Sequence, residues 1–240
     1  MSYLVFDIET RIDKGLVRSI YLPGAAVSDD EAFAQVRQQL LAEHQSDFFP
    51  LSFHLPIVIV LAAIRDDLSW EGAQILSSAD GSGRDIAQDF WSRVESFSGT
   101  LVTFNGRGFD LPVMELQALR HGVPAPRNFN DRHGARARYS DKHYDLHEFI
   151  TNFGMYRVRG GLDLLTKLIG LPGKTSVAGG DVQKLWEAGE LAAIERYCQA
   201  DVIQTYLLLL RVEQLRGRIS GARLDELWQA AAPLRASLTG

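Results

Sequence analysis

Residues 3–10 read Tyr3-Leu4-Val5-Phe6-Asp7-Ile8-Glu9-Thr10, an apolar run that leads into two carboxylates. The run up to Phe6 contains β-favouring residues and no charged ones, which predicts a strand buried on both faces at the centre of a sheet. Asp7 and Glu9 then lie at the end of that strand. Because they are two residues apart, their side chains point to the same face. Two such acids can share hard cations, although acids at a strand end often have only a structural or solvated role.

The rest of the chain alternates between strand and helix patterns. Apolar runs rich in β-favouring residues predict strands over 57–65, 70–76 and 100–104, the first two joined as a β-hairpin. Apolar residues at helical spacing predict helices over 28–44, 111–121, 162–169, 190–216 and 222–232, with a further apolar stripe through 86–97. The first of these helices has a capping-box spacing at Ser28 and Glu31. The fold class indicated is α/β with a helical C-terminal part.

The 240 residues, 46% of them hydrophobic, are enough to bury one large core. No Pro- or Gly-rich linker divides the chain, so we expect a single domain over 1–240, with a core over about 1–217 and a C-terminal helix over 221–234. The longest uncharged apolar run, 55–64, is far shorter than the roughly 20 residues that cross a bilayer. Acids interrupt the apolar start, and a single cysteine cannot form an internal disulfide. We therefore expect a cytoplasmic location and no membrane contact.

The net charge of −5 is unusual for a protein that binds nucleic acid, because such proteins normally have a basic surface. The charge is unevenly distributed, however. Residues 118–160 contain eight Lys or Arg and four acids, which makes this stretch locally +4. One interpretation is a solvated loop face. The other, which the motifs below favour, is that Arg132, Arg136 and Arg138 attract a phosphate backbone.

Two further segments place acids at defined points of the predicted elements. Residues 105–112 (NGRGFDLP) follow a predicted strand and open a helix, so Asp110 lies at or beside the helix N-terminus, where it could also be merely an N-cap. Tyr197 and Asp201 lie within the long predicted helix, and their i, i+4 spacing puts them on one face. Cys198 between them is interpreted as a packing residue and not a nucleophile, because no paired base accompanies it.

Together the three segments supply Asp7, Glu9, Asp110, and then Tyr197 and Asp201, in that order. This set of motifs resembles the DEDD superfamily of 3′–5′ exonucleases, which is DnaQ-like, in its tyrosine-bearing DEDDy subgroup. The middle segment is most similar to the proofreading exonuclease domain of family B DNA polymerases. The whole chain looks like bacterial stand-alone proteins predicted to be exonucleases related to that domain. The similarity extends to Arg216 through the segments Gly161-Leu162-Asp163 and Gly170-Leu171-Pro172-Gly173-Lys174.

The resemblance implies a ribonuclease H-like fold, in which a mixed β-sheet is flanked by helices and the acids converge at one edge. It also implies two divalent cations, Mg²⁺ or Mn²⁺, as cofactors. Asp7 would bridge both ions, Glu9 and Asp201 would complete the ion that holds the attacking water, and Asp110 would serve the second ion. Tyr197 would orient the water. Cations are needed physically, because two carboxylates 4 Å apart repel each other by roughly 4 kcal/mol at an effective dielectric constant of 20.

The resemblance implies substrate contacts as well. Asn105 would hydrogen-bond to the terminal nucleotides and Phe109 would stack on them, although Phe109 could equally be a core residue. Thr10 and Arg107 are the other expected substrate-binding residues. About 45 residues between Thr10 and the next predicted strand depart from compact members of the family. The substrate contacts of this insertion are therefore open.

The predicted substrate is the 3′ end of a single-stranded nucleic acid, with DNA favoured over RNA. The alternatives are a 3′–5′ exoribonuclease and a catalytically silent nucleic-acid-binding or scaffold protein. An endonuclease or transposase of the same broad fold ranks lower, because such proteins typically lack the Tyr-x-x-x-Asp helix. The residues leave no room for a polymerase domain, and a protein partner is left open. None of the six histidines is assigned to catalysis, and His44 and His54 are interpreted as structural.

Overall fold

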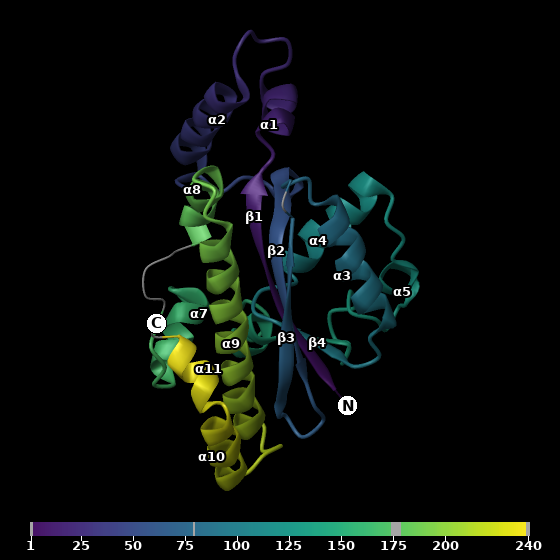
Figure 1. Ribbon diagram of the computed structural model, residues 1–240, viewed down its shortest axis with the longest axis vertical. Helices are drawn as coiled ribbons and strands as arrows, with labels where there is room; N and C mark the ends of the chain where they lie inside the picture. The colour runs from purple at the N-terminus through teal and green to yellow at the C-terminus, as the bar shows by residue number, and fades with distance from the viewer. Residues whose placement is uncertain (1, 79, 174–178, 239–240) are drawn as a thin grey trace.

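The computed structural model of the protein describes residues 2–78, 80–173 and 179–238. Lys174 and both ends of the predicted domain lie outside these residues. Five strands form one sheet in the order β3-β2-β1-β4-β5 (Figure 1). Their bounds are β1 (Tyr3–Ile12), β2 (His54–Ile64), β3 (Trp70–Ser77), β4 (Thr100–Thr103) and β5 (His143–Asp145). β1, β2 and β3 pair antiparallel, whereas β4 and β5 continue the sheet parallel to β1, so the expected mixed sheet is confirmed.

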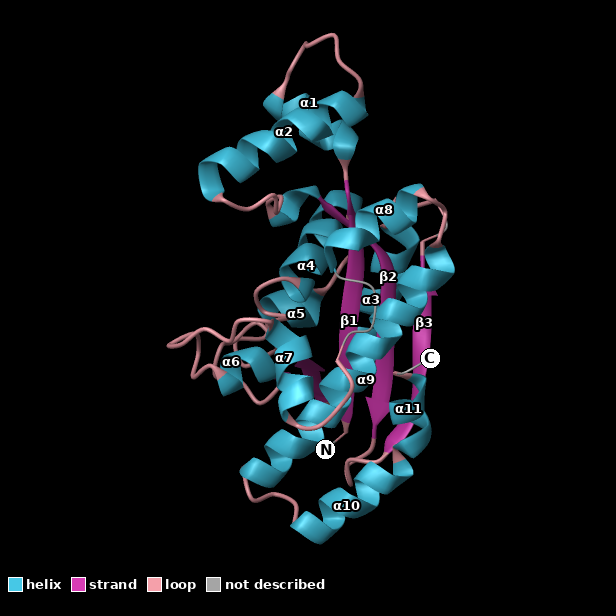
Figure 2. Ribbon diagram, turned by 90° about the vertical axis from the view of Figure 1, so that its left-hand side faces the viewer, coloured by secondary structure: helices cyan, strands magenta, loops and turns pink. Residues whose placement is uncertain are grey.

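Helices cover both faces of this sheet (Figures 1 and 2). The described residues form α1 (Lys14–Tyr21), α2 (Asp29–His44), α3 (Arg84–Ser96), α4 (Asp110–His121), α5 (Pro126–Asn130), α6 (Leu146–Ile150), α7 (Gly161–Leu168), α8 (Val182–Glu187), α9 (Leu191–Leu215), α10 (Gly221–Ala230) and α11 (Ala232–Ser237). Two 3₁₀ turns lie at Leu51–Phe53 and Gly179–Asp181. One face of the sheet packs against α9 and the helices around it, and the other packs against α3 and α4. The expected flanking helices and helical C-terminal part are confirmed.

The side chains of β1 alternate between these two cores. Val5 belongs to the core under α9, whereas Phe6 and Ile8 belong to the core under α3 and α4. Because successive side chains of a strand point to opposite faces, Asp7 and Glu9 point toward α9. The burial of the apolar residues therefore determines the face on which the two acids lie.

The central strand is longer than the apolar run predicts. β1 continues to Ile12, so the prediction that Asp7 and Glu9 lie at the strand end is wrong, and both lie within it. Pairing with β2 along the whole length of β1 explains the extension. On the other side, β4 ends at Thr103, and its pairing with β1 covers only the residues up to Val5. The backbone of the second half of β1 is therefore accessible to other groups from this side.

The insertion between β1 and β2 forms a helical lobe beyond the C-terminal end of β1 (Figures 1 and 2). α2 begins as the capping-box spacing predicts, because the Ser28 hydroxyl accepts the N–H of Glu31 and the Glu31 carboxylate accepts the N–H of Ser28. α1 is not predicted by the pattern. It packs against α2 around a small core that includes Val17 and Val36.

Ion pairs join this lobe to the rest of the protein. Lys14 at the start of α1 pairs with Glu187 of α8 as well as with Asp30 of α2. Asp13, just before α1, pairs with Arg120 of α4 at 2.7 Å. The lobe is therefore in contact with helices from both faces of the sheet.

The predicted C-terminal helix over 221–234 is wrong in one respect, because α10 and α11 are separate helices that meet at Ala231. Pro233 lies in the first turn of α11, and its ring has no N–H with which to continue a preceding helix. β5, α5, α6 and α8 also lack a prediction, since elements of three to six residues are too short for a periodic pattern. The predicted hairpin and long helix are confirmed as β2–β3 and α9. Among the described residues, no helix combines the length and apolar character of a membrane span.

A buried histidine leads to a prediction about stability in acid. His143 of β5 lies with Nε2 2.8 Å from Thr103 Oγ1. Burial, and then the charge of Arg107, lower the pKa of His143 to about 3. Between its ordinary pKa and this value, the unfolded state binds a proton that the folded state does not. As the pH falls through this window, the group should lower the free energy of unfolding by about 1.4 kcal/mol per pH unit.

His143→Gln keeps a polar group beside Thr103 and removes the titration. We predict that the free energy of unfolding in urea falls less steeply between about pH 6 and pH 4 for this variant than for the wild type. His44→Gln, a change at an exposed histidine, is the matched control. Equal slopes for wild type and His143→Gln would contradict the assignment.

Candidate functional site

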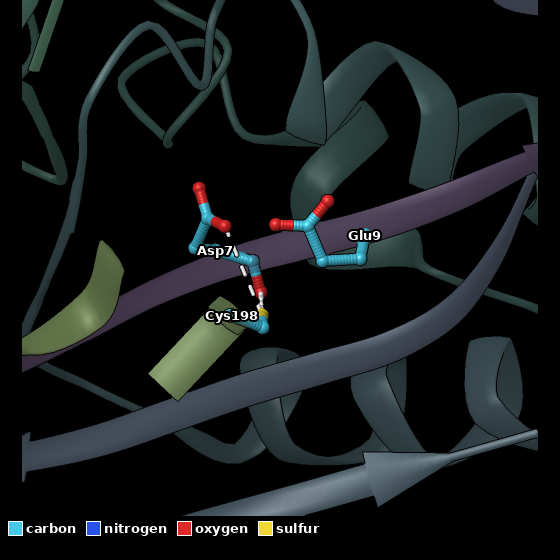
Figure 3. A group of neighbouring side chains, drawn as sticks. All are labelled: Asp7, Glu9 and Cys198. Atoms are coloured by element: carbon cyan, nitrogen blue, oxygen red, sulfur yellow. Dashed lines mark hydrogen bonds between the residues drawn. The ribbon is translucent and has the colours of Figure 1, made fainter. Parts of the chain in front are cut away.

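Asp7 and Glu9 lie side by side on β1, and Cys198 of α9 faces them (Figure 3). One atom from each, a carboxylate oxygen from either acid and the Cys198 sulfur, lie within 4.8 Å of one another. Glu9 is buried, and Asp7 is partly buried. Three potential metal ligands, two from β1 and one from α9, thus lie close together.

Tyr197 and Asp201 of α9 belong to the same group. Both are buried, and they are one helical turn apart. Burial raises the pKa of the Tyr197 phenol far above its ordinary value, and the charges of Asp201, Glu9 and Asp7 raise it further. The phenol therefore keeps its proton at neutral pH and lies in the field of three carboxylates. The structure thus brings residues of the first and third sequence motifs together.

Asp110 approaches the acids from the start of α4. Its Oδ1 accepts a hydrogen bond from the N–H of Ile8, 3.1 Å away, on the part of β1 that extends past β4. The N-cap position of α4 belongs to Phe109, so the alternative reading of Asp110 as a simple N-cap is wrong. Burial raises the pKa of Asp110 to about 7, and the charges of Asp145 and Asp201 act in the same direction. The hydrogen bond to Ile8 thus joins Asp110 to the strand that carries Asp7 and Glu9, and the charge of Asp201 reaches it from α9.

Asp145 supports the loop that leads to Asp110, a role that was not predicted from the sequence. Its carboxylate accepts the backbone N–H groups of Asn105 and Arg107, each at 2.9 Å, and those of His147 and Glu148 at the start of α6. The support matters because Asn105 has a φ of 65°, in the left-handed region. The signal that indicates such a residue is an acid directly before a helix, the usual N-cap position.

Asp145→Asn should therefore destabilise the protein. An amide offers one acceptor oxygen where the carboxylate offers two, so at least one N–H of the loop loses its partner. The loss of a hydrogen bond to a charged group costs about 1.5 to 3 kcal/mol, and urea unfolding should show a decrease of this size. Asp141→Asn, at an exposed acid four residues earlier, should change the free energy of unfolding little. The role would be disproved by equal stability of Asp145→Asn and wild type.

The guanidinium of Arg107 contacts protein groups. It donates to the carbonyls of Ala135 at 2.8 Å and His143 at 3.2 Å, and its Nε lies 3.0 Å from a carboxylate oxygen of Glu148. These contacts join the loop of Asn105 to β5 and α6. The predicted contact between Arg107 and the substrate stays a prediction, and it would have to compete with them.

A pocket of about 540 Å³ opens beside the same loop. Its lining includes Asn105, Glu115, Arg136, Arg138, Glu148 and Phe153. Arg136 pairs with Glu115 at 3.0 Å, and Arg138 lies 3.8 Å from Glu148. Both guanidinium groups are about half exposed despite these pairs. They can still attract phosphate, so the prediction for the basic stretch stays open.

Cys198 is fully buried, and its thiol lies 3.4 Å from the carbonyl oxygen and 3.7 Å from a carboxylate oxygen of Asp7. Burial raises the pKa of this thiol well above its ordinary value, and the charges of Asp7, Glu9 and Asp201 raise it further. The thiol therefore stays protonated and donates weakly to Asp7. A buried, protonated thiol is a poor nucleophile. The packing interpretation agrees with the structure but omits the contact with Asp7.

Next to the acids lies an aromatic group. The Thr10 hydroxyl is 2.7 Å from Nδ1 of His54, and Nε2 of His54 is 3.1 Å from the carbonyl oxygen of Phe49. Because a carbonyl can only accept, Nε2 carries a proton. Burial lowers the pKa of His54, which favours the neutral ring, and Nδ1 of the neutral ring accepts from the Thr10 hydroxyl. His54 also packs edge-on against Phe109, with ring centroids 5.1 Å apart, so the purely structural interpretation of His54 missed its place beside the site.

The donor set fits hard divalent cations. Asp7, Glu9, Asp110 and Asp201 offer carboxylate oxygens, which Mg²⁺ and Mn²⁺ prefer, whereas the thiol of Cys198 is protonated. Of the four acids, all but Asp7 are more than nine-tenths buried. Acids so buried and so close require a compensating charge or a proton. Divalent cations would supply that charge.

The fold is a ribonuclease H-like exonuclease fold. It has a mixed five-stranded sheet with two acids on the central strand, and α9 and the start of α4 each add a further acid. The chain belongs to the family of predicted 3′–5′ exonucleases related to the exonuclease domain of PolB, whose model matches residues 46–238. The resemblance drawn from the motifs is thereby confirmed. The match begins after β1, so it does not include Asp7, Glu9 or Thr10, and their place in the site rests on the geometry above.

Solved structures have the same fold. The family B DNA polymerase from the hyperthermophilic archaeon Pyrobaculum calidifontis aligns with a TM-score of 0.60 and 18% identity, over 97% of this chain and 27% of the polymerase. E. coli Exonuclease I in complex with a dT13 oligonucleotide aligns with a TM-score of 0.42 and 13% identity, over 90% of this chain and 42% of that protein. At this identity, the likeness to the polymerase shows a shared fold and nothing further. The TM-score of the second alignment is too low to support a conclusion. Curated protein sequences contain no match to this chain.

Proposed function

We propose that this protein is a metal-dependent 3′–5′ exonuclease that removes nucleoside monophosphates from the 3′ end of single-stranded nucleic acid, DNA in preference to RNA. The observation that carries the proposal is the convergence of Asp7 and Glu9 of β1 with Tyr197 and Asp201 of α9. Separate segments of a chain have no folding reason to place acids together, because the acids repel each other. A charge-neutralising ligand explains the arrangement.

The four acids would hold two divalent cations, Mg²⁺ or Mn²⁺. Bound there, the cations would lower the pKa of the attacking water and stabilise the charge on the leaving 3′-oxygen. The chain itself positions the ligands: β1 keeps Asp7 and Glu9 on one face, and the N–H of Ile8 holds the carboxylate of Asp110. The charge of Asp201 on α9 acts on Tyr197 together with the charges of Asp7 and Glu9. The ligands are therefore preorganised by rigid elements and not by flexible loops.

Tyr197 would orient the water for in-line attack. The water oxygen forms the new bond to phosphorus, the bond from phosphorus to the 3′-oxygen breaks, and that oxygen takes a proton. Because its pKa is raised far above neutral, the Tyr197 hydroxyl remains protonated and acts as a hydrogen-bonding group and not as a base.

Features beside the loop that leads to Asp110 support a single-stranded substrate. The pocket next to Asn105 is bordered by the half-exposed Arg136 and Arg138, and by Phe153, which is itself partly exposed. Positive charge for the backbone and aromatic rings for unpaired bases are the two components of single-strand binding. The preference for DNA is supported by the family's relationship to a DNA polymerase domain.

The test is to incubate the purified protein with 5′-labelled single-stranded DNA and with RNA of the same sequence, in Mg²⁺, in Mn²⁺ and in EDTA. We expect a ladder that shortens from the 3′ end, only with metal, and faster on DNA. Internal cuts would indicate an endonuclease, and binding without shortening would indicate a silent binding protein. Faster shortening of RNA would overturn the preference for DNA.

A further inference from the structure

The insertion contributes one ring to the aromatic group beside the acids. Phe48 follows α2, and its ring centroid lies 5.1 Å from that of His54 and 5.9 Å from that of Phe109. His54 and Phe109 also contact each other, so the three rings form one cluster. Phe48 is 57% exposed, whereas His54 is buried. The cluster therefore presents an aromatic surface to solvent.

Two residues in or bonded to this aromatic cluster are direct sequence neighbours of the acids. Phe109 directly precedes Asp110, and Thr10, which donates to His54, directly follows Glu9. The pairing of β1 with β2 also shifts in register between Glu9 and Thr10, with Ile57 as the extra residue on β2. Irregular pairing of this kind is common next to active sites. A ligand that reaches the acids with one end therefore passes close to the aromatic surface.

Phe48 is exposed although its neighbours are held in place. Asp47, before it, forms an ion pair with Arg37 of α2, and the two hydrogen bonds are 2.8 and 2.5 Å long. Phe49, after it, is buried and stacks on Phe33 with ring centroids 5.2 Å apart. The position of Phe48 is thus determined by α2 and by the core of the lobe. A ring fixed in advance loses little conformational entropy when a ligand binds.

We propose that Phe48 and Phe109 form a stacking surface for a nucleobase near the 3′ end of the strand, which makes the insertion part of the substrate site. The identity of the ligand rests on the proposed exonuclease function. Bases stack on aromatic rings in a way that tolerates any sequence, as a degradative enzyme requires. A docked protein would need a far larger area, on the order of 1,000 Å² in total, than one exposed ring beside a partly exposed one provides.

The test compares two 5′-labelled single-stranded DNA oligonucleotides, one complete and one without bases at its two 3′-terminal positions. Phe48→Ala should raise KM for the complete oligonucleotide about 10-fold with kcat little changed, because stacking contributes to binding and not to the chemical step. The same variant should behave like wild type on the base-free oligonucleotide. Phe48→Trp should retain the low KM. Leu41→Ala is the matched control, because Leu41 is 54% exposed on the same lobe.

Two results would overturn the proposal: an unchanged KM in Phe48→Ala, or an equal loss on both oligonucleotides, which would mean that Phe48 acts through the backbone or the fold. Equilibrium binding of the same oligonucleotides in EDTA, measured by fluorescence anisotropy, gives the same comparison without catalysis. If the wild type shortens neither substrate, the exonuclease function fails. The anisotropy comparison then decides the stacking surface by itself, since a loss specific to the complete oligonucleotide supports it and any other pattern refutes it.

Discussion

Asp7→Ala should leave the protein folded and reduce 3′-end cleavage by roughly 10³-fold or more, which corresponds to the loss of several kcal/mol of charge stabilisation in the transition state. Asp7 lies beside Glu9 on β1, and its charge acts on both Tyr197 and Cys198 of α9. The Cys198 thiol also donates to Asp7, which connects this acid directly to α9. Single-turnover kinetics with a 5′-labelled oligonucleotide at saturating Mn²⁺ measure the loss.

Metal binding provides a readout independent of activity. At 100 times the dissociation constant, a bound cation should stabilise the wild type by about 2.7 kcal/mol, and Asp7→Ala should lose most of this gain in thermal melting. Without metal, the variant should be at least as stable as the wild type, because one member of a repelling group is removed. Asp89→Ala, which removes an exposed acid from α3, is the control with the same change in charge. Near wild-type cleavage by Asp7→Ala, or an undiminished metal shift, would disprove the assignment.

Asp201→Ala and Tyr197→Phe should have effects of different size although the two residues share one face of α9. Asp201 would hold a cation, so its loss should bring cleavage close to the background. Tyr197→Phe keeps the ring in the core and deletes only the hydroxyl that would orient the water. Groups that position a proton or a water contribute roughly 10² to 10⁴ in rate, and an orienting role should give a loss at the low end.

The loss in Tyr197→Phe should appear in kcat with KM little changed, because neither substrate nor metal binding needs the hydroxyl. Steady-state and single-turnover kinetics at matched metal concentration separate the two terms. Tyr139→Phe, which removes a hydroxyl from a highly exposed ring, should have wild-type rates. Wild-type speed in Tyr197→Phe would mean that the tyrosine only packs, and it would refute its role as the water-orienting residue of a DEDDy enzyme.

The relative directions of side chains within one strand or one helix of the site could be predicted from the sequence. The i, i+2 spacing of Asp7 and Glu9 and the i, i+4 spacing of Tyr197 and Asp201 fix relative directions within one element, and the structure agrees with both. The length of β1 could not be predicted in the same way. Asp and Glu have low strand propensity, and pairing with β2, far away in the sequence, continues the strand to Ile12.

Contacts between distant segments account for the other omissions. Asp145 lies in a strand of only three residues, and its four backbone hydrogen bonds come from the loop of Asn105 and from the first turn of α6, which no periodic pattern connects. His54 and Phe48 lie beside Phe109 only because the insertion folds back over the end of the sheet. An insertion that departs from compact relatives offers no family pattern from which to infer such contacts.

The elements that carry the acids are also the ones least able to open separately. β1 is the central strand, and α9 continues from Asp201 into the fully buried Leu207, Leu209 and Leu210. Such elements exchange their amide hydrogens mainly through global unfolding, so heat inactivation should coincide with the loss of tertiary structure when both are followed across temperature. The lobe of α1 and α2 has its own small core and can loosen earlier. On warming, the proposed stacking of Phe48 on the nucleic acid would then be lost at a lower temperature than the cleavage of the phosphodiester bond.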